Sequence, residues 1–258
     1  MTKQESLSAL RKSFFLYALL LTTTAILPAG CAFAPPTETP LPQIRFVDNN
    51  KQSSALIIML PGRGDRAETF VAEGFQHQGQ QFGFDTIMVD AHFGYYKERS
   101  LIPRLHQDIV LPAKAAGYQE IWMLGVSMGG FGSVLYASNH PEELDGVILL
   151  APYLGDRNVI DEIEESGGLE SWNPAESNLK DYEIAAWSWL RDSTSNDSHS
   201  QVVLGYGLSD RLASAYPVLL ERLDAQQIYT VEGGHGWRSW ITLWNEISAE
   251  LDFQPDPQ

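Results

Sequence analysis

One serine of the chain lies where a serine side chain can act as a nucleophile. Ser127 is the central residue of the run GVSMG at positions 125–129, between a hydrophobic stretch at 119–124 and a helical pattern. A strand that turns sharply into a helix forces its turning residue into a strained conformation and holds that side chain above the sheet. The positions on either side must be small, because a Cβ there would collide with neighbouring backbone, and Gly125 and Gly129 meet that requirement.

Two other residues have types and positions that could activate such a serine. A serine hydroxyl is a weak nucleophile at neutral pH and needs a base within hydrogen-bond reach. Of the six histidines, His235 lies between two glycines after the last predicted strand, and an imidazole can accept and return a proton near neutral pH. Asp210 follows the preceding predicted strand and would orient the imidazole and stabilise its cation.

Strands and helices alternate along the chain in a way that would bring these residues to one edge of a sheet. Short apolar runs typical of buried strands occur at 54–60, 86–89, 119–124, 145–150, 201–204 and 227–231. Helical patterns lie between them, including 100–116, 128–139 and 212–223. Such alternation predicts a mostly parallel sheet with helices on both faces. In such sheets the active site lies at the carboxyl ends of the strands.

The motifs and the alternating elements resemble the α/β-hydrolase superfamily, and are most similar to esterase-like members of the esterase D and acyltransferase type. The resemblance covers about residues 54–251. It implies an α/β-hydrolase fold, with a mostly parallel central sheet, helices on both faces and room for a small lid insertion. It also implies that Ser127, Asp210 and His235 form a catalytic triad, because the superfamily has its triad residues in that chain order.

Two backbone N–H groups are expected to stabilise the negative charge that attack on an acyl group creates. One belongs to Met128, directly after the nucleophile, and the other to the loop PGRGD at 61–65. Arg63 is the expected donor in that loop, with Gly62 and Gly64 as alternatives. The loop lacks the three-glycine run of many lipases, so the oxyanion hole could be shaped differently.

Two tryptophans follow the histidine at helical spacing. The run His235-Gly236-Trp237-Arg238-Ser239-Trp240 is similar to the H-x-W-x-x-W that follows the catalytic histidine in the esterase D-like group. Residues three apart share one face of a helix. We interpret both indoles as packing this helix against the sheet, with direct substrate contact as the alternative.

The first thirty residues differ in composition from the rest of the chain. Lys3, Arg11 and Lys12 precede an apolar stretch of fourteen residues at 14–27. A membrane-spanning helix needs about twenty apolar residues, so this stretch predicts a signal peptide at 1–30.

The end of the predicted signal peptide resembles a bacterial lipobox. The run LPAGC ends at Cys31, the single cysteine of the chain, which in a lipoprotein becomes the lipid-modified N-terminus. Pro28 departs from the pattern, because an aliphatic residue usually occupies that position. The expected location is therefore the bacterial cell envelope, on a lipid anchor in the membrane. The alternatives are a periplasmic or secreted protein, cleaved after the CAFA run at 31–34, or a retained anchor.

One folded domain is expected after this segment. Residues 31–50 are rich in proline and threonine and predict an extended tether, and residues 51–258 predict the domain itself. A chain with one cysteine forms no intrachain disulfide, so the domain must be stabilised by its hydrophobic core.

The chain is acidic, with a formal net charge of −16 at pH 7. This charge argues against nucleic acid and anionic lipid surfaces as partners. Residues 156–200 hold eleven acidic and three basic residues, net −8, and interrupt the strand pattern. They also carry Trp172, Trp187 and Trp189. The insertion is either a lid whose aromatic residues line an acyl or aryl pocket, or a solvated acidic surface segment.

Together these features predict an exported serine hydrolase that cleaves a small-molecule or lipid-like carboxylic ester through an acyl-enzyme. No cofactor and no metal site is expected from the sequence. An acyltransferase or a peptidase could use the same triad. A catalytically silent lipoprotein that uses the fold for binding is the alternative of another class.

Overall fold

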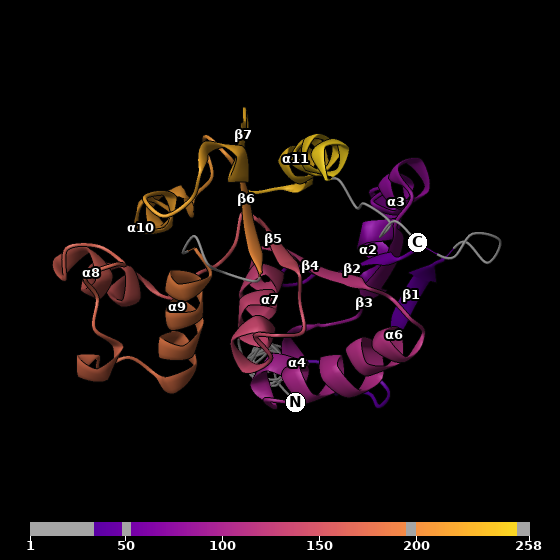
Figure 1. Ribbon diagram of the computed structural model, residues 1–258, viewed down its shortest axis with the longest axis horizontal. Helices are drawn as coiled ribbons and strands as arrows, with labels where there is room; N and C mark the ends of the chain where they lie inside the picture. The colour runs from indigo at the N-terminus through magenta and orange to yellow at the C-terminus, as the bar shows by residue number, and fades with distance from the viewer. Residues whose placement is uncertain (1–33, 48–52, 195–199, 252–258) are drawn as a thin grey trace, which may run out of the picture. The chain divides into compact units, whose positions relative to one another are not determined.

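The computed structural model describes residues 34–47, 53–194 and 200–251. Its centre is a seven-stranded sheet in the order β1-β3-β2-β4-β5-β6-β7 (Figure 1). The strands are β1 (Gln43–Phe46), β2 (Ala55–Leu60), β3 (Asp85–Val89), β4 (Glu120–Val126), β5 (Gly146–Leu150), β6 (Gln201–Gly207) and β7 (Ile228–Val231). Neighbouring strands are parallel except β1, which runs antiparallel to β3.

Helices cover both faces of this sheet. They are α2 (Ala67–Ala72), α3 (Gln76–Phe82), α4 (Phe93–Lys97), α5 (Leu101–Leu105), α6 (Leu111–Ala115), α7 (Met128–Asn139), α8 (Arg157–Glu165), α9 (Asp181–Ser193), α10 (Pro217–Leu220) and α11 (Trp237–Glu250). α7 packs on β2, β4 and β5, whereas α2, α3 and α11 pack on the opposite side (Figure 1). The predicted fold class, α/β with a mostly parallel sheet, is confirmed.

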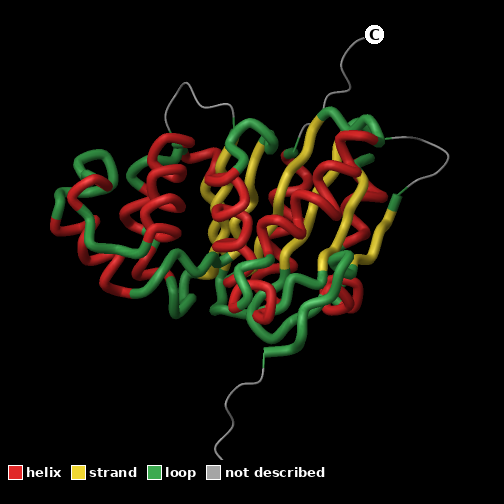
Figure 2. Tube along the Cα trace, turned by 90° about the horizontal axis from the view of Figure 1, so that it is seen from below, coloured by secondary structure: helices red, strands yellow, loops and turns green. Residues whose placement is uncertain are grey.

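The central strands are buried on both faces because the alternating side chains of each strand enter two separate cores. In β2, Leu56, Ile58 and Leu60 join the core beneath α7, and the intervening Ile57 and Met59 join the core beneath α11. A strand with two covered faces has an uninterrupted apolar sequence, which is why the apolar runs in the sequence predict these strands. Figure 2 shows the strands side by side, with helices around them.

The domain begins earlier than the sequence predicts, and the tether prediction for residues 35–46 is wrong. Leu41 is 1% exposed, and its N–H donates to Asp108 at 2.8 Å. β1 then pairs with β3 at the sheet edge. The segment is extended, as its proline and threonine content predicts. However, the buried Leu41 and the pairing of β1 with β3 attach it to the domain. The predicted signal peptide and Cys31 lie outside the described residues.

Two predicted helices are interrupted. The 212–223 pattern forms only a 3-10 turn and the four-residue α10, because Pro217 has no N–H to continue a preceding helix. The 100–116 pattern contains a π-helical segment, His106–Val110, between α5 and α6. π segments often occur near functional groups.

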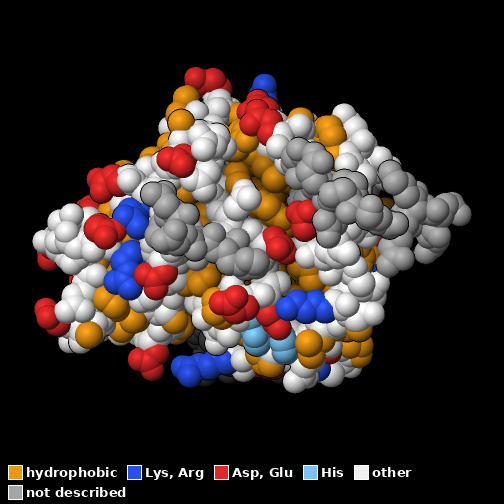
Figure 3. All heavy atoms as spheres, viewed as in Figure 1, with side chains coloured by type: hydrophobic (Ala, Val, Ile, Leu, Met, Phe, Trp, Pro, Cys, Tyr) orange, Lys and Arg blue, Asp and Glu red, His pale blue; other side chains and the backbone are white. Residues whose placement is uncertain are grey.

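Acidic residues are not confined to the insertion at 156–200. They are spread over the face of the molecule shown in Figure 3, where basic side chains are fewer. No helix in the described parts of the chain is both long and apolar enough to cross a membrane.

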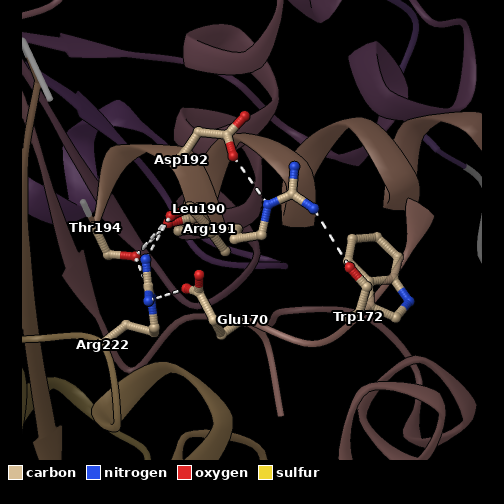
Figure 4. A network of polar contacts seen from close by, with 7 residues as sticks. All are labelled: Glu170, Trp172, Leu190, Arg191, Asp192, Thr194 and Arg222. Atoms are coloured by element: carbon tan, nitrogen blue, oxygen red, sulfur yellow. Dashed lines mark hydrogen bonds and ion pairs between the residues drawn. The ribbon is translucent and has the colours of Figure 1, made fainter. Parts of the chain in front are cut away.

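The insertion at 156–200 is packed onto the domain by buried aromatic residues and arginine contacts. The indole of Trp187, 1% exposed, donates to the carbonyl of Leu154 at 2.9 Å. Figure 4 shows the arginine contacts: Arg222, after α10, binds the Glu170 carboxylate and the Arg191 carbonyl. Arg191 in turn donates to the carbonyl of Trp172 at 3.3 Å (Figure 4). These contacts attach the insertion to the loop after β5 and to Arg222, after α10.

Of the two alternatives for the insertion, a lid whose tryptophans line an acyl or aryl pocket gains no support from Trp172 and Trp187. Trp172 and Trp187 are buried in the core shared by α7, α8 and α9. Trp189 lines a cavity of about 430 Å³ together with Ser138 and Pro141, at the far end of α7 from Ser127. Large indoles placed between helices are packing residues, and a sequence pattern cannot distinguish that burial from the lining of a pocket.

Candidate active site

Ser127 lies on the turn between β4 and α7 and has a strained backbone. Its φ is 51° and its ψ is −113°, a conformation that L-residues rarely adopt. Three backbone hydrogen bonds stabilise this turn: the Ser127 N–H donates to Leu150, and the Ser127 carbonyl accepts from Gly130 and Tyr153, all at 2.9–3.0 Å. The surrounding strands therefore hold the serine in a position that it would not adopt alone.

The glycines on either side of Ser127 are required by close backbone approach. A Cβ on Gly125 would lie 2.3 Å from the carbonyl oxygen of Gly129, and one on Gly129 would lie 2.1 Å from that of Leu60. Neither position has room for a side chain. The prediction that both residues must be small is confirmed.

The structure brings the three predicted residues into one hydrogen-bonded chain. His235 Nε2 lies 2.9 Å from Ser127 Oγ, and His235 Nδ1 lies 3.0 and 2.9 Å from the two carboxylate oxygens of Asp210. A carboxylate only accepts hydrogen bonds, so the Nδ1 atom carries the proton and Nε2 presents its lone pair to the serine hydroxyl. The Asp210 and His235 side chains are only 0% and 9% exposed, so water has little access to the hydrogen bond between them.

Separate loops position the two partners of the serine. Asp210 follows β6, where its carboxylate also accepts from the N–H of Leu212 at 2.8 Å. His235 follows β7, and its ring packs edge-on against Trp240 at 5.2 Å. Both loops leave the carboxyl ends of adjacent strands, which explains why residues 25 positions apart meet.

The two tryptophans after His235 pack α11 onto the domain, as interpreted from their spacing. Trp240 is 5% exposed and belongs to the core beneath α11. Trp237 contacts Phe70, Phe75 and Trp240 through edge-to-face ring pairs at 5.2–5.4 Å. Their packing fixes the helix that begins two residues after His235.

The two expected oxyanion donors flank the nucleophile turn. Met128 opens α7, and a Cβ on Gly62 would lie 3.6 Å from the Cβ of Ser127, so the 61–65 loop reaches the serine. Within the described residues, the N–H groups of Met128 and Arg63 have no hydrogen-bond acceptor. Their assignment to an oxyanion hole stays a prediction.

Aromatic residues border the other side of the turn. Phe131 lies one turn after Ser127 on α7 and forms edge-to-face pairs with Tyr153 at 5.8 Å and Tyr182 at 6.0 Å. Tyr182, from the insertion, is 42% exposed. Tyr182 therefore brings an aromatic ring of the insertion to Phe131, near the end of α7 that carries the nucleophile.

A second polar cluster, which the sequence did not predict, lies at the far end of α7. His106, His140 and Glu143 offer ligand atoms that lie within 4.8 Å of one another. The two imidazole rings stack in parallel, with centroids 4.2 Å apart and planes 8° apart. Lone pairs of parallel rings do not converge on one ion, so this arrangement is a hydrogen-bonded cluster. Spacing along the sequence could not reveal it, because His106 and His140 belong to different elements.

The seven-stranded sheet and the serine on its strand-to-helix turn define a class of protein, the α/β hydrolases. The family model described as "alpha/beta hydrolase fold" matches residues 56–198, more than half of the chain, and the chain belongs to that family. The resemblance inferred from the sequence is thereby confirmed at the level of the family. A comparison with curated proteins finds no match.

Several solved structures share the fold. S-formylglutathione hydrolase (FrmB) from Staphylococcus aureus has a TM-score of 0.55 and 15% identity, over 77% of this chain and 81% of that chain. Est1E from Butyrivibrio proteoclasticus, solved with bound ferulic acid, has a TM-score of 0.55 and 20% identity, over 81% and 94%. FphF, a fluorophosphonate-binding serine hydrolase of Staphylococcus aureus, has a TM-score of 0.54 and 11% identity, over 83% and 94%.

Proposed function

We propose that the protein is a serine hydrolase that cleaves carboxylic esters through an acyl-enzyme. The observation that carries the proposal is the hydrogen-bonded chain from Ser127 Oγ through both nitrogens of His235 to Asp210. Nucleophilic catalysis by serine requires a base within hydrogen-bond reach of the hydroxyl, and His235 Nε2 lies 2.9 Å from Ser127 Oγ. Membership of the α/β-hydrolase family supports a hydrolase.

The proposed reaction has two halves. In the first, Ser127 Oγ attacks the carbonyl carbon while its proton passes to His235 Nε2, and the negative charge moves to the carbonyl oxygen. Asp210 stabilises the imidazolium, and the N–H groups of Met128 and Arg63 stabilise the oxyanion. When the intermediate collapses, His235 returns the proton to the leaving alkoxide, so an alcohol departs and an acyl-serine remains.

The second half repeats these proton transfers with water as the nucleophile. Water gives its proton to His235 as its oxygen bonds to the acyl carbon. The carbon–serine bond then breaks, Ser127 Oγ regains the proton, and a carboxylic acid is released. An alcohol or amine in place of water would give an acyl transfer, so the released products decide between the two reactions.

The test is hydrolysis of p-nitrophenyl acetate and butyrate by the wild type and by Ser127→Ala. We expect activity to be abolished in the variant while its unfolding curve is unchanged, and the wild type to be labelled by a fluorophosphonate probe. Undiminished turnover by Ser127→Ala would contradict the nucleophile. Absence of labelling in the wild type would favour a catalytically silent binding protein.

We also propose that the protein is exported and anchored through a lipid on Cys31. The supporting observation is the short apolar stretch before LPAGC at 27–31. In a bacterial host, radioactive palmitate should label the wild type but not Cys31→Ser. A soluble, unlabelled wild type cleaved after the CAFA run would contradict the anchor.

A further inference from the structure

The 61–65 loop next to Ser127 has a fixed backbone and carries an exposed arginine. The N–H of Asp65 donates to the Gly62 carbonyl at 3.1 Å, which closes a turn around Arg63. Immediately after the loop, the Arg66 guanidinium forms an ion pair with Asp90 at 2.6 Å. These contacts hold the loop in place, whereas the side chain of Arg63 is exposed to solvent.

An aromatic ring orients that side chain beside the nucleophile turn. The guanidinium carbon of Arg63 lies 5.0 Å from the ring centroid of Phe93, a cation–π contact. Phe93 opens α4, and Tyr96, three residues later on the same side of that helix, donates its hydroxyl proton to the Met128 carbonyl at 3.1 Å. The face of α4 that supports Arg63 is therefore the face that is bound to the residue after Ser127.

The positive charge of Arg63 is not neutralised by the protein. Within the described parts of the chain Arg63 forms no ion pair, although Arg66 in the neighbouring turn is paired with Asp90 and acidic residues outnumber basic ones. A guanidinium held against a ring, with its N–H groups free, matches the planar pair of oxygens of a carboxylate. A singly charged carboxylate also suffers less repulsion from this acidic chain than a doubly charged phosphate would.

We propose that Arg63 binds a free carboxylate on the substrate, so that the preferred substrates are esters that carry a second, unesterified carboxyl group. This proposal rests on ester hydrolysis at Ser127. It assigns to the Arg63 side chain a role in specificity that is separate from the expected role of its backbone N–H. The carboxylate would lie on the side of the site formed by the 61–65 loop and α4.

The test compares matched pairs of charged and neutral esters. One pair is monomethyl glutarate and the same ester with a carboxamide in place of the carboxylate, and the other is acetoxyacetic acid and its amide. The first pair carries the charge on the acyl arm and the second on the alcohol arm. We expect the wild type to have the higher kcat/KM for the charged ester in at least one pair.

Substitution of Arg63 should change the ratio of the two kcat/KM values. Hydrogen bonds to a charged group predict a fall in the charged-to-neutral ratio of about ten- to a hundred-fold in Arg63→Gln, with an intermediate ratio in Arg63→Lys. A substitution that slows the catalytic steps common to both esters lowers both kcat/KM values equally and leaves their ratio unchanged. Arg66→Gln is the matched control, because that guanidinium is already paired, and its ratio should equal that of the wild type.

Binding to the inactive protein separates failure of this proposal from failure of the proposed reaction. Calorimetric titration of the charged esters into Ser127→Ala and into the double variant with Arg63→Gln needs no turnover. A dissociation constant about ten-fold weaker in the double variant, for the charged ester only, supports the proposal. Equal constants, or equal ratios in Arg63→Gln and wild type, overturn it even if Ser127 is the nucleophile.

Discussion

Helix α7 has a hydroxyl, an imidazole and a carboxylate at each of its two ends, about 18 Å apart for a helix of 12 residues. At the first end, His235 lies between its partners. One ring nitrogen contacts the Ser127 hydroxyl and the other contacts the Asp210 carboxylate. A proton can therefore move from the hydroxyl to the ring while the carboxylate stabilises the resulting charge.

At the second end, the hydroxyl and an imidazole both contact one carboxylate, and they also contact each other. The Tyr136 hydroxyl donates directly to Glu143 at 2.6 Å, and Nδ1 of His106 lies 3.1 Å from that hydroxyl and 3.0 Å from the same carboxylate. Burial, and then the hydrogen bond and charge of Glu143, raise the pKa of Tyr136. The tyrosine thus keeps its proton, and the cluster connects α7 to the segment before β5.

The two ends have the same kinds of groups but differ in how those groups are connected. The Ser127 hydroxyl contacts the imidazole and not the carboxylate, so the imidazole can take its proton, whereas the Tyr136 hydroxyl donates directly to a carboxylate and is held as a neutral donor. Which group contacts which, and not the types of residue present, therefore separates a candidate catalytic centre from a structural cluster.

The largest expected difference between the two ends is in catalysis. Asp210→Asn should lower kcat about 10³- to 10⁴-fold, because an amide can donate to Nδ1 and favour the wrong tautomer of His235. Steady-state kinetics with p-nitrophenyl butyrate measures the effect. Glu143→Gln is the matched control at the other end, and a loss of kcat there as large as in Asp210→Asn would break the comparison.

The next expected effect is on the backbone at the nucleophile end. Gly129→Ala should lower the free energy of unfolding by about 3 kcal/mol, because its Cβ would meet the rigid Leu60 carbonyl. Urea unfolding measures this loss. Asn139→Ala, at the exposed far end of the helix, should cost less than about 1 kcal/mol. An equal loss of unfolding free energy in the two variants would mean that Gly129 has room for a Cβ and that α7 does not pack closely against β2.

Glu143 makes the stability of the far end depend on pH. Burial opposes its ionisation, but the Tyr136 hydrogen bond and the charges of Lys114 and His106 outweigh burial and lower the pKa of Glu143 below its ordinary 4.5. A lowered pKa means that the carboxylate stabilises the fold above pH 4.5, and that this contribution is lost as pH falls through the folded value.

Glu143→Gln should therefore cost about 1–2 kcal/mol of unfolding free energy at pH 7. The difference from the wild type should shrink as the pH falls below 4.5 in urea titrations. A difference that stays constant over this range would show that the ionised carboxylate is not what stabilises the cluster.

The smallest expected effect is that of Tyr136→Phe. This change removes one hydroxyl from the cluster and should cost about 1 kcal/mol of stability with kcat unchanged. Thermal unfolding and kinetics on the same preparations measure both quantities. A change in kcat, with stability intact, would indicate that the two ends of α7 are coupled.

Much of the fold was predictable because the two-sided burial of the sheet produces long apolar runs, as at 54–60 and 145–150. β1 was not predictable in this way, since an edge strand of four residues with mixed polarity has no such run. Ser127, Asp210 and His235 were predictable because glycine context and chain order identify them. The Glu143 cluster was not, because its members become neighbours only when His106, at the start of the π-helical segment, packs against Tyr136 of α7.

The edge strand β1 bears on where the chain can be shortened. A shortened chain that starts at residue 51 would lack the strand that occupies the free edge of β3, so the unpaired N–H and C=O groups of Asp85–Val89 would face solvent. Such an edge is a template for pairing with other molecules, and aggregation would follow. It would also leave the Tyr95 hydroxyl and the Asp108 carboxylate without their partners at Glu38 and Leu41. A soluble enzyme for biochemical work should therefore begin before Pro35.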